Sequence, residues 1–363
     1  MKLGIFCNFS HRSVGGSEIV LKEISERLVK QFNYEVAVYS YSVHSSFSEN
    51  GVKYVPCKRG YGLIAQINEN DHIFVYSDSF WGWDTIVEKI DRIDCEVSVA
   101  LVGAYHMQSH PKTLDLLKKN IDRFNLITHS SITPDYKWCI DNGLPVEVIP
   151  NGVNLEEFRQ NTIDFREKYN IKEKYVILNV GNFFYGKGFE LLPQICRRIS
   201  TFMQDFIILQ VSNVVKYPYD KIFFERTKKQ SKGMNIRFFR DLPREDVIAA
   251  FKNADTFLFT SKKEVAPLVI LEARVAETPW LSMDVGNLEE QKGGMVLKNK
   301  NKDHKGYKIV DDILLGKFAA NVGNIVRNKR INKDLTCECQ QDIKKSDWEN
   351  IVPLYDKVFS NEV

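Results

Sequence analysis

Short apolar runs alternate along this chain with stretches in which apolar residues recur every three or four positions. In the first half, the runs lie at residues 3–7, 36–41, 72–76, 97–102, 126–128 and 146–149. In the second half, they lie at residues 175–180, 206–211, 236–239, 256–259 and 280–283. The runs lack a period of two, which is typical of parallel strands covered on both faces by crossover helices. The pattern therefore predicts an α/β protein with two doubly wound, Rossmann-like domains.

A turn-rich segment, residues 149–154, separates the two halves. We expect an N-terminal domain over residues 1–160 and a C-terminal domain over residues 170–345. Such sheets bind ligands beyond the carboxyl ends of their strands, so the two domains are expected to face each other across a cleft. Residues 346–363 have the apolar spacing of a final amphipathic helix interrupted at Pro353. This helix could pack on the second domain or return to the first.

Size and charge exclude several classes of protein. A chain of 363 residues exceeds the length at which one core usually stops growing. A net charge of +3 gives no support for general nucleic-acid binding. No stretch approaches the ~20 apolar residues that cross a bilayer, so any membrane contact is expected to be peripheral.

The cysteines indicate a reducing compartment. There are seven of them, an odd number without a paired framework. The pair Cys337 and Cys339 lacks a second ligand cluster, so no metal site is predicted. We expect a cytoplasmic protein, with peripheral contact at the inner membrane face left open.

The most informative segment joins an apolar strand to an apolar-faced helix. Glu264 lies in the loop, and Glu272 follows after seven intervening residues. Pro267 is placed to begin the helix, whose first amides, at Leu268 and Val269, suit a phosphate. A carboxylate on either side of a phosphate suggests recognition of hydroxyl groups, as in a nucleotide-sugar. The alternative is a solvated loop residue and an ordinary helix-surface charge.

Three further loops carry candidate ligand contacts. Gly15 and Gly16 precede a helix and allow close approach of the backbone to a ligand, although they also fit a tight turn. Lys187 follows a strand beside glycines, where it could neutralise a diphosphate or be a solvated cation. His106 follows the fourth strand and is interpreted as a hydrogen-bonding residue of the cleft rather than a metal ligand, with a structural histidine as the alternative.

Together these segments resemble the retaining glycosyltransferases of family four, over nearly the whole chain. The matching segments are residues 15–18, 148–154, 180–188, 264–272 and 347–349. The resemblance implies a GT-B fold. It also implies that the C-terminal domain holds a nucleotide-sugar, that the N-terminal domain holds the acceptor, and that the final helix returns to the first domain.

The resemblance also implies roles for individual residues. Glu264 corresponds to the glutamate that binds donor sugar hydroxyls, and Glu272 to the one that binds ribose. Lys187 corresponds to the diphosphate lysine, and Gly16 to the loop glycine near the diphosphate and the reacting centre. His106 matches a histidine that contacts the donor sugar.

Three positions depart from the family pattern. Asn182 stands where an arginine is usual, which removes one of two expected phosphate cations. Arg240 stands where glycine is frequent, and either compensates for that loss or shapes the base pocket. Glu277 replaces a frequent glycine. These changes bear on donor affinity, donor identity and activity.

We therefore expect a metal-independent, retaining glycosyltransferase without a cofactor. Its partners would be a nucleoside-diphosphate sugar, such as a UDP-sugar, and an acceptor glycan, lipid-linked saccharide or other hydroxyl compound. The alternative is a catalytically weak or inactive GT-B protein that binds sugar or nucleotide. A dinucleotide-dependent oxidoreductase is disfavoured, because the first strand is not followed by Gly-x-Gly-x-x-Gly.

Overall fold

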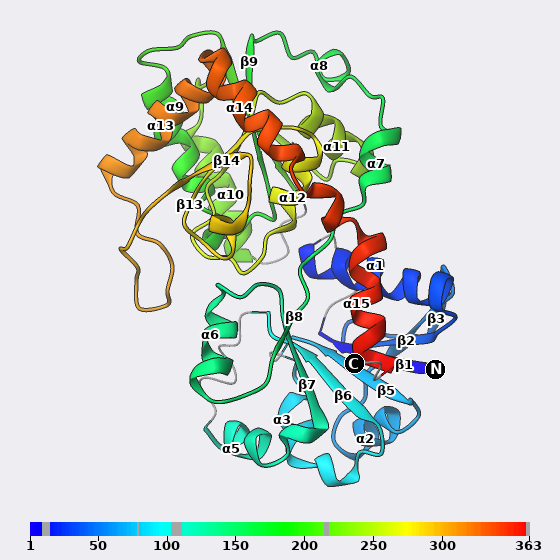
Figure 1. The fold of residues 1–363 in the computed structure, drawn as a ribbon. Coiled ribbons are helices and arrows are strands. Elements are labelled where there is room, and N and C mark those ends of the chain that lie inside the picture. Colours follow the sequence, from blue (N-terminus) through cyan, green and yellow to red (C-terminus); the bar gives the residue numbers. More distant parts are fainter. Residues whose placement is uncertain (9–14, 78–79, 103–110, 214–217, 361–363) are drawn as a thin grey trace. The chain divides into compact units, whose positions relative to one another are not determined.

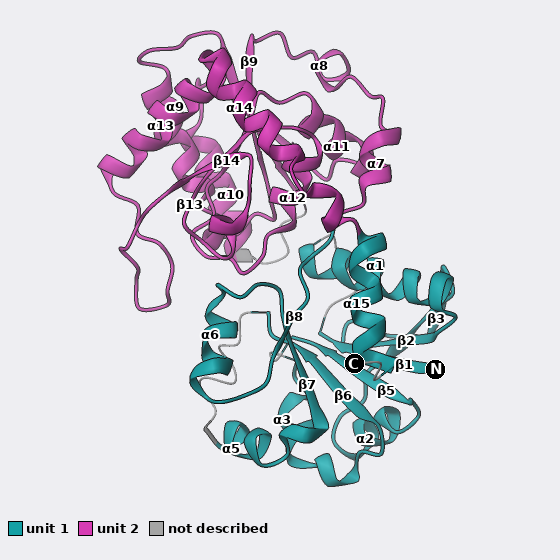
Figure 2. Ribbon diagram, viewed as in Figure 1, with its two compact units in different colours: residues 1–152, 348–363 teal, residues 153–347 magenta. Residues whose placement is uncertain are grey.

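The computed structural model describes residues 1–8, 15–77, 80–102, 111–213 and 218–360. The chain forms two compact units (Figure 2). Unit 1 combines residues 1–152 with residues 348–363, and unit 2 is the continuous segment 153–347. Within the described residues, no helix has both the length and the apolar character needed to span a membrane.

Unit 1 is built around an eight-stranded sheet in the order β3-β4-β2-β1-β5-β6-β7-β8. Its strands are β1 (Lys2–Cys7), β2 (Glu35–Ser40), β3 (Phe47–Glu49), β4 (Val52–Pro56), β5 (His72–Tyr76), β6 (Glu96–Ala100), β7 (Phe124–Thr128) and β8 (Glu147–Val148). All neighbours are parallel except β3 and β4, which form an antiparallel hairpin at one edge. The six strands from β4 to β7 have the Rossmann order 3-2-1-4-5-6, with the switch point between β1 and β5.

Helices connect these strands and cover the sheet (Figure 1). They are α1 (Gly16–Phe32), α2 (Tyr61–Ile67), α3 (Trp83–Glu88), α5 (Pro111–Lys119), α6 (Pro134–Asp141) and α15 (Trp348–Ser360). Helix α1 buries an apolar stripe that includes Val20, Ile24 and Leu28. It ends at Asn33, whose left-handed conformation (φ 57°) terminates the helix.

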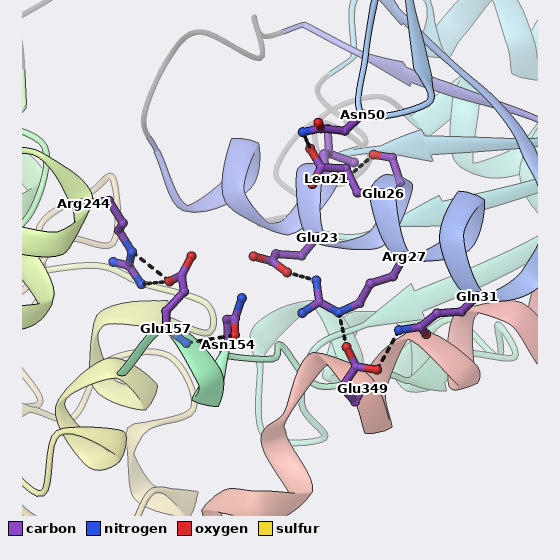
Figure 3. A network of polar contacts seen from close by, with 11 residues as sticks. Leu21, Glu23, Glu26, Arg27, Gln31, Asn50, Asn154, Glu157, Arg244 and Glu349 are labelled. Carbon is purple, nitrogen blue, oxygen red and sulfur yellow. Dashed lines mark hydrogen bonds and ion pairs between the residues drawn. The ribbon is translucent and has the colours of Figure 1, made fainter. Parts of the chain in front are cut away.

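The final helix, α15, belongs to unit 1 and packs beside α1. Trp348 is buried where its ring lies against Gly152, a position at which a Cβ would come within 2.5 Å of the ring. At the surface of the same unit, the Arg27 Nε donates to Glu349 at 3.0 Å and the Gln31 amide donates to it at 2.6 Å (Figure 3).

The predicted interruption at Pro353 is wrong, because α15 runs unbroken from Trp348 to Ser360. Proline removes one hydrogen bond to the carbonyl four residues earlier, that of Glu349. Trp348, before the proline, is buried against Gly152, and Tyr355 and Phe359, after it, are buried against Phe74 of β5, so both halves of the helix are fixed. The packing of these side chains therefore keeps the helix continuous despite the hydrogen bond that Pro353 removes.

Unit 2 is built around a six-stranded, fully parallel sheet in the order β11-β10-β9-β12-β13-β14. Its strands are β9 (Tyr175–Val180), β10 (Phe206–Ser212), β11 (Ile236–Arg240), β12 (Thr256–Phe259), β13 (Trp280–Met283) and β14 (Gly294–Leu297). This is again the order 3-2-1-4-5-6, and the switch point lies between β9 and β12.

The helices of unit 2 surround one continuous apolar core. They are α7 (Leu155–Gln160), α8 (Phe165–Lys168), α9 (Leu192–Ile199), α10 (Pro218–Gln230), α11 (Arg244–Lys252), α12 (Leu268–Val275), α13 (Asp312–Arg327) and α14 (Lys329–Gln340). Helix α7, expected within the first domain, lies in unit 2.

Candidate functional site

The loops after β9 and β12 bring Lys187 and Glu264 together at the switch point of unit 2. Lys187 ends a short 3₁₀ turn, Tyr185–Lys187, and Glu264 follows β12 by five residues. The Lys187 Nζ donates to Glu264 Oε1 at 2.5 Å, with side chains 23% and 11% exposed. Two opposite charges, 77 residues apart in sequence, thus form a partly buried ion pair where parallel sheets bind ligands.

Gly188 fixes the position of the lysine loop. Its φ is +69°, and a Cβ there would lie 2.1 Å from the carbonyl oxygen of Thr260. The Thr260 hydroxyl donates to the carbonyl of Lys187 at 2.9 Å. Only glycine allows the backbone to approach the end of β12 this closely. Gly188 therefore fixes the backbone position from which the Lys187 side chain extends.

The glutamate loop is held from both sides. The Ser261 hydroxyl donates to the Glu264 carboxylate, the same group that Lys187 contacts. The amide of Asn287 donates to the carbonyl of Val265 at 2.9 Å. Gly286, at φ +55°, passes so close to that carbonyl that a Cβ would lie 2.3 Å from it. Glu264 is therefore a positioned carboxylate rather than a solvated loop charge.

Helix α12 begins one residue later than predicted. Pro267 has extended backbone angles (φ −72°, ψ 122°) and is the N-cap, and Leu268 is the first helical residue. The first amides of a helix lack intrahelical acceptors and lie at the positive end of its dipole. In sequence, Leu268 and Val269 thus present such amides between Glu264, in the preceding loop, and Glu272, within the helix.

Glu272 is only 6% exposed and is bound by an arginine that the sequence analysis did not identify. The Arg244 Nη1 donates to Glu272 Oε1 at 2.5 Å. The same guanidinium donates from Nε and Nη2 to Glu157 Oε2, both at 3.1 Å (Figure 3). Burial lowers the pKa of Arg244, but the carboxylates of Glu272 and Glu157 raise it by a larger amount. The pKa of Arg244 therefore lies above its ordinary value. Arg244 therefore stays charged and fixes one oxygen of Glu272.

Asn182, which stands where a cation was expected, is neutral and hydrogen-bonded. Its side-chain oxygen accepts from Asn213 Nδ2 at 3.3 Å, across the ends of β9 and β10. The nearby Lys262 does not replace the missing arginine. It is 4% exposed, donates to Glu190 at 2.6 Å and lies 3.3 Å above the ring of Tyr185.

Arg240 ends the edge strand β11, and its guanidinium lies 5.2 Å from the ring centre of Phe224. It borders a cleft of about 700 Å³ between α10 and β11. The basic residues lining this cleft are Lys228, Lys229, Lys232, Arg237 and Arg240. Arg240 thus lies along the carboxyl edge of the sheet, two strands from β9.

The remaining predicted residues belong to the N-terminal part. Gly16 is the exposed first residue of α1 in unit 1. His106 lies outside the described residues, as does most of the loop before Gly15. Among the residues that the structure describes, no group of three or more His, Cys, Asp or Glu side chains could hold a metal ion.

Two Rossmann-type units in one chain, each with the strand order 3-2-1-4-5-6, define the GT-B fold. Solved structures share this fold over 99% of the chain. One is the Anabaena protein Alr3699/HepE in complex with UDP-glucose, with a TM-score of 0.76, 14% identity and 100% of that chain covered. Another is sucrose-phosphate synthase from Thermosynechococcus elongatus, with a TM-score of 0.75, 14% identity and 99% covered. Residues 161–309 match the family described as glycosyl transferases group 1.

Two curated proteins are also similar to parts of this chain. The phosphatidylinositol N-acetylglucosaminyltransferase GPI3 subunit of Saccharomyces cerevisiae (strain YJM789) is 23% identical over 261 residues, which cover 69% of this chain and 53% of the relative. An uncharacterized 41.2 kDa protein in the cps region of Klebsiella pneumoniae is 27% identical over 169 residues, covering 43% of this chain and 42% of that protein. The chain thus spans about half the length of the curated relatives that it matches.

Proposed function

We propose that this protein transfers a sugar from a nucleoside-diphosphate donor to an acceptor hydroxyl, with retention at the anomeric carbon. The observation that carries the proposal is the Lys187–Glu264 pair, set at the switch point of unit 2 just before α12. A cation, free amides and two carboxylates match the diphosphate, sugar hydroxyls and ribose of such a donor.

In this mechanism, negative charge grows on the departing diphosphate, and stabilising it lowers the barrier. Lysine has three donor hydrogens, so Lys187 can hold Glu264 with one and offer the others to phosphate. The amides of Leu268 and Val269 add further donors. We propose that these groups supply the positive charge without a metal or other cofactor.

The two glutamates would bind opposite ends of the donor. Glu264 accepts hydrogen bonds from sugar hydroxyls, and Glu272, oriented by Arg244, accepts them from ribose. We propose attack of the acceptor from the face of the leaving group, with a phosphate oxygen taking its proton. A double displacement would instead require a carboxylate nucleophile beneath the anomeric carbon.

The donor and acceptor proposals draw on the similar proteins. HepE is solved with UDP-glucose, which supports a UDP-sugar donor bound by unit 2. A trehalose-phosphate synthase from Burkholderia xenovorans, with a TM-score of 0.76 and 11% identity, is solved with glucose-6-phosphate. We propose that unit 1 holds the acceptor, a saccharide or lipid-linked saccharide. The seven free cysteines support a reducing, cytoplasmic setting, with peripheral membrane contact when the acceptor carries a lipid.

The proposal is tested by Glu264→Gln and Lys187→Ala, assayed for nucleotide release and sugar transfer across several nucleotide-sugars. Loss of one such stabilising group typically lowers the rate by roughly 10²–10³. Lys298 and Glu289 form a matched ion pair in the same unit, with side chains 64% and 49% exposed. Lys298→Ala and Glu289→Gln should retain activity. Full activity of Glu264→Gln or Lys187→Ala, with the fold intact, would refute the assignment.

The Asn182–Asn213 contact supports a second candidate, a GT-B protein that binds nucleotide or sugar without turnover. The diphosphate would then meet one cation where the family has two. In this case the wild-type protein would bind a donor but release no free nucleotide. Asn182→Arg should then create or raise turnover, whereas in an active enzyme it should change mainly the donor KM.

A further inference from the structure

Unit 1 carries an open aromatic pocket of about 290 Å³ that plays no part in the site described above. Its lining is formed by Tyr41, Arg59, Gly60, Leu63, Trp81, Gly82 and Thr85. Small-molecule sites typically occupy about 300–1,000 Å³, so this one fits a single ring rather than a long chain.

The pocket lies at the carboxyl edge of the sheet of unit 1. Tyr41 follows β2 directly, and Trp81 follows β5 by five residues. The Trp81 amide donates at 3.1 Å to the side-chain oxygen of Asn8, the residue after β1. The pocket therefore adjoins the β1–β5 switch point, where Rossmann-type sheets bind ligands.

Trp81 is held in place but left uncovered. Its ring stacks on Tyr41 at 5.4 Å, and Tyr41 stacks at 5.4 Å on buried Phe80. At Gly82 a Cβ would lie 2.5 Å from Phe80 and 2.6 Å from Leu63, so a glycine is needed for the turn to press into the core. Trp81 is nevertheless 67% exposed. A fixed, exposed indole is a flat apolar surface ready for a ligand.

Arg59 adds one positive charge to this surface. Its guanidinium carbon lies 5.5 Å from the ring centre of Tyr41 and 5.9 Å from that of Trp81. Within the described part of the chain, Arg59 has no carboxylate partner. Stacking on the aromatic rings orients its planar donors, which suit a carboxylate or a phosphate.

We propose that this pocket binds a sugar ring that carries an anionic group, with the apolar face of the ring on Trp81 and the carboxylate or phosphate on Arg59. The site is the acceptor subsite, an assignment that rests on the proposed transferase function. A neutral sugar offers the guanidinium only hydroxyl acceptors, whereas a carboxylate or a phosphate forms stronger, charge-assisted hydrogen bonds with it. The acceptor is therefore a uronic acid or a sugar phosphate, free or at the end of a longer saccharide.

Saturation-transfer NMR and calorimetric titration of the full chain, without donor, test the binding. The probes are methyl glucuronide, glucose 6-phosphate, neutral methyl glucoside and uridine monophosphate. We expect both charged sugars to bind at least 10-fold more tightly than methyl glucoside. A larger gain for one of them identifies the anion as carboxylate or phosphate.

Variants separate the two parts of the site. Trp81→Ala should abolish binding of all three sugars, and Arg59→Gln should remove only the preference for charge. Arg59 is exposed, so its substitution should not impair folding, and circular dichroism checks the fold of Trp81→Ala. Tyr61 is a matched control, because its side chain is 73% exposed and the guanidinium carbon of Arg92 lies 5.5 Å from its ring centre. The Tyr61→Ala variant should bind the sugars as wild type does.

Equal binding of charged and neutral sugars would overturn the proposal, as would unchanged binding by Trp81→Ala. Binding of uridine monophosphate alone would show a nucleotide site and would also overturn it. Because the titration contains no donor, it is independent of turnover. If wild type lacked transferase activity but bound charged sugars through Trp81, the transferase proposal would fail while the binding site would stand.

Discussion

At the scale of single residues, two ion pairs dominate the candidate site, Lys187–Glu264 and Arg244–Glu272. Each pair includes a carboxylate that is largely buried, with side-chain exposures of 11% and 7%. Removing one member of a buried pair leaves an uncompensated charge, which is more damaging than losing an exposed pair. Substitutions at these residues should therefore affect both donor binding and stability.

Arg244→Lys tests whether the guanidinium orients Glu272 for ribose. Lysine keeps the charge but cannot contact Glu272 and Glu157 together through a planar fork. We expect the donor KM to rise about 10-fold, the size of a ~1.4 kcal/mol loss, with a smaller change in kcat. Discrimination between a ribose donor and its 2′-deoxy analogue should also fall, which a purely structural role would not produce. Arg159→Lys, in an exposed pair with Glu156, is the control.

Gly188→Ala tests the close approach that positions Lys187. The substitution places a Cβ at φ +69° and 2.1 Å from the Thr260 carbonyl, so the loop must move. Left-handed strain alone is about 1–2 kcal/mol, and the clash adds to it. Gly233 has φ +76° and open space around it, so Gly233→Ala carries the strain without the clash. Denaturant unfolding and donor turnover should show a larger loss for Gly188→Ala, and equal losses would contradict this role of Gly188.

The sequence identified residues that stand next to recognisable strands, but not residues that act through tertiary packing. Glu264 and Lys187 follow apolar runs, so their loops could be located. Arg244 is 28 residues from Glu272, and only the packing of α11 on α12 joins them. Trp81 also follows a strand, but a binding role for an exposed tryptophan can be inferred only when its spatial neighbours are known. The catalytic and donor-binding roles stay predictions.

At the scale of elements, the apolar runs located most strands, and the missed ones share a physical cause. β9 and β12 were predicted with their observed bounds. The strands β3, β4 and β14 were missed. β3 and β14 contain no fully buried residue, and β4 alternates buried with exposed positions beside the sheet edge. Edge strands lack the continuous apolar run that central parallel strands require.

His72 in β5 links the packing of α15 to pH. Burial lowers the pKa of His72 to about 4, and the nearby backbone of Phe359 only partly opposes the shift. Its ring lies 2.8 Å from the Ser98 hydroxyl and 5.0 Å from the ring centre of Phe359 in α15. The folded state therefore holds this imidazole neutral over a range where the unfolded chain binds a proton.

The sign of the effect follows from proton binding. Between the ordinary histidine pKa of about 6.5 and the folded value of about 4, the unfolded chain binds more protons, so stability falls as pH decreases. The full contribution is about 3 kcal/mol. Denaturant unfolding from pH 7 to pH 4 should show this slope, and His72→Phe should reduce it. His44→Phe, at an exposed histidine, is the control and should leave the slope of stability against pH unchanged. An unchanged slope in His72→Phe would contradict the assignment of this pH dependence to His72.

At the scale of the whole molecule, unit 1 is assembled from both ends of the described chain, and unit 2 from one continuous segment. The GT-B fold predicted from the sequence is confirmed, and residues 161–309 match the glycosyl transferases group 1. The alternation of strands and helices was enough to predict the two sheets, because a doubly wound fold repeats one unit, a strand followed by a crossover helix and the next parallel strand. The return of α15 came from the resemblance, since an amphipathic pattern does not say which surface it covers.

Truncation after Asp347 tests how far unit 1 depends on α15. The deletion removes buried Trp348, Ile351, Val352, Tyr355 and Phe359 from the core of unit 1. At about 1.5–3 kcal/mol for each large side chain, the loss is comparable with the 5–15 kcal/mol stability of a typical domain. We expect unit 1 to lose hydrogen-exchange protection while unit 2 keeps it. Glu349→Gln changes only a 58% exposed side chain of the same helix and should leave both units protected. A protected unit 1 after truncation would contradict the dependence.

The split composition of unit 1 has a consequence during synthesis on the ribosome. Residues 1–152 emerge before their α15 partner, which is translated only about 200 residues later, roughly 10–40 s at ordinary elongation rates. Throughout that interval the nascent first unit exposes the apolar surface that Trp348 and Phe359 will cover, whereas the second unit can complete its core as soon as it leaves the exit tunnel. Docking of α15 is thus the step that ends the exposure of this apolar surface to chaperones and to aggregation.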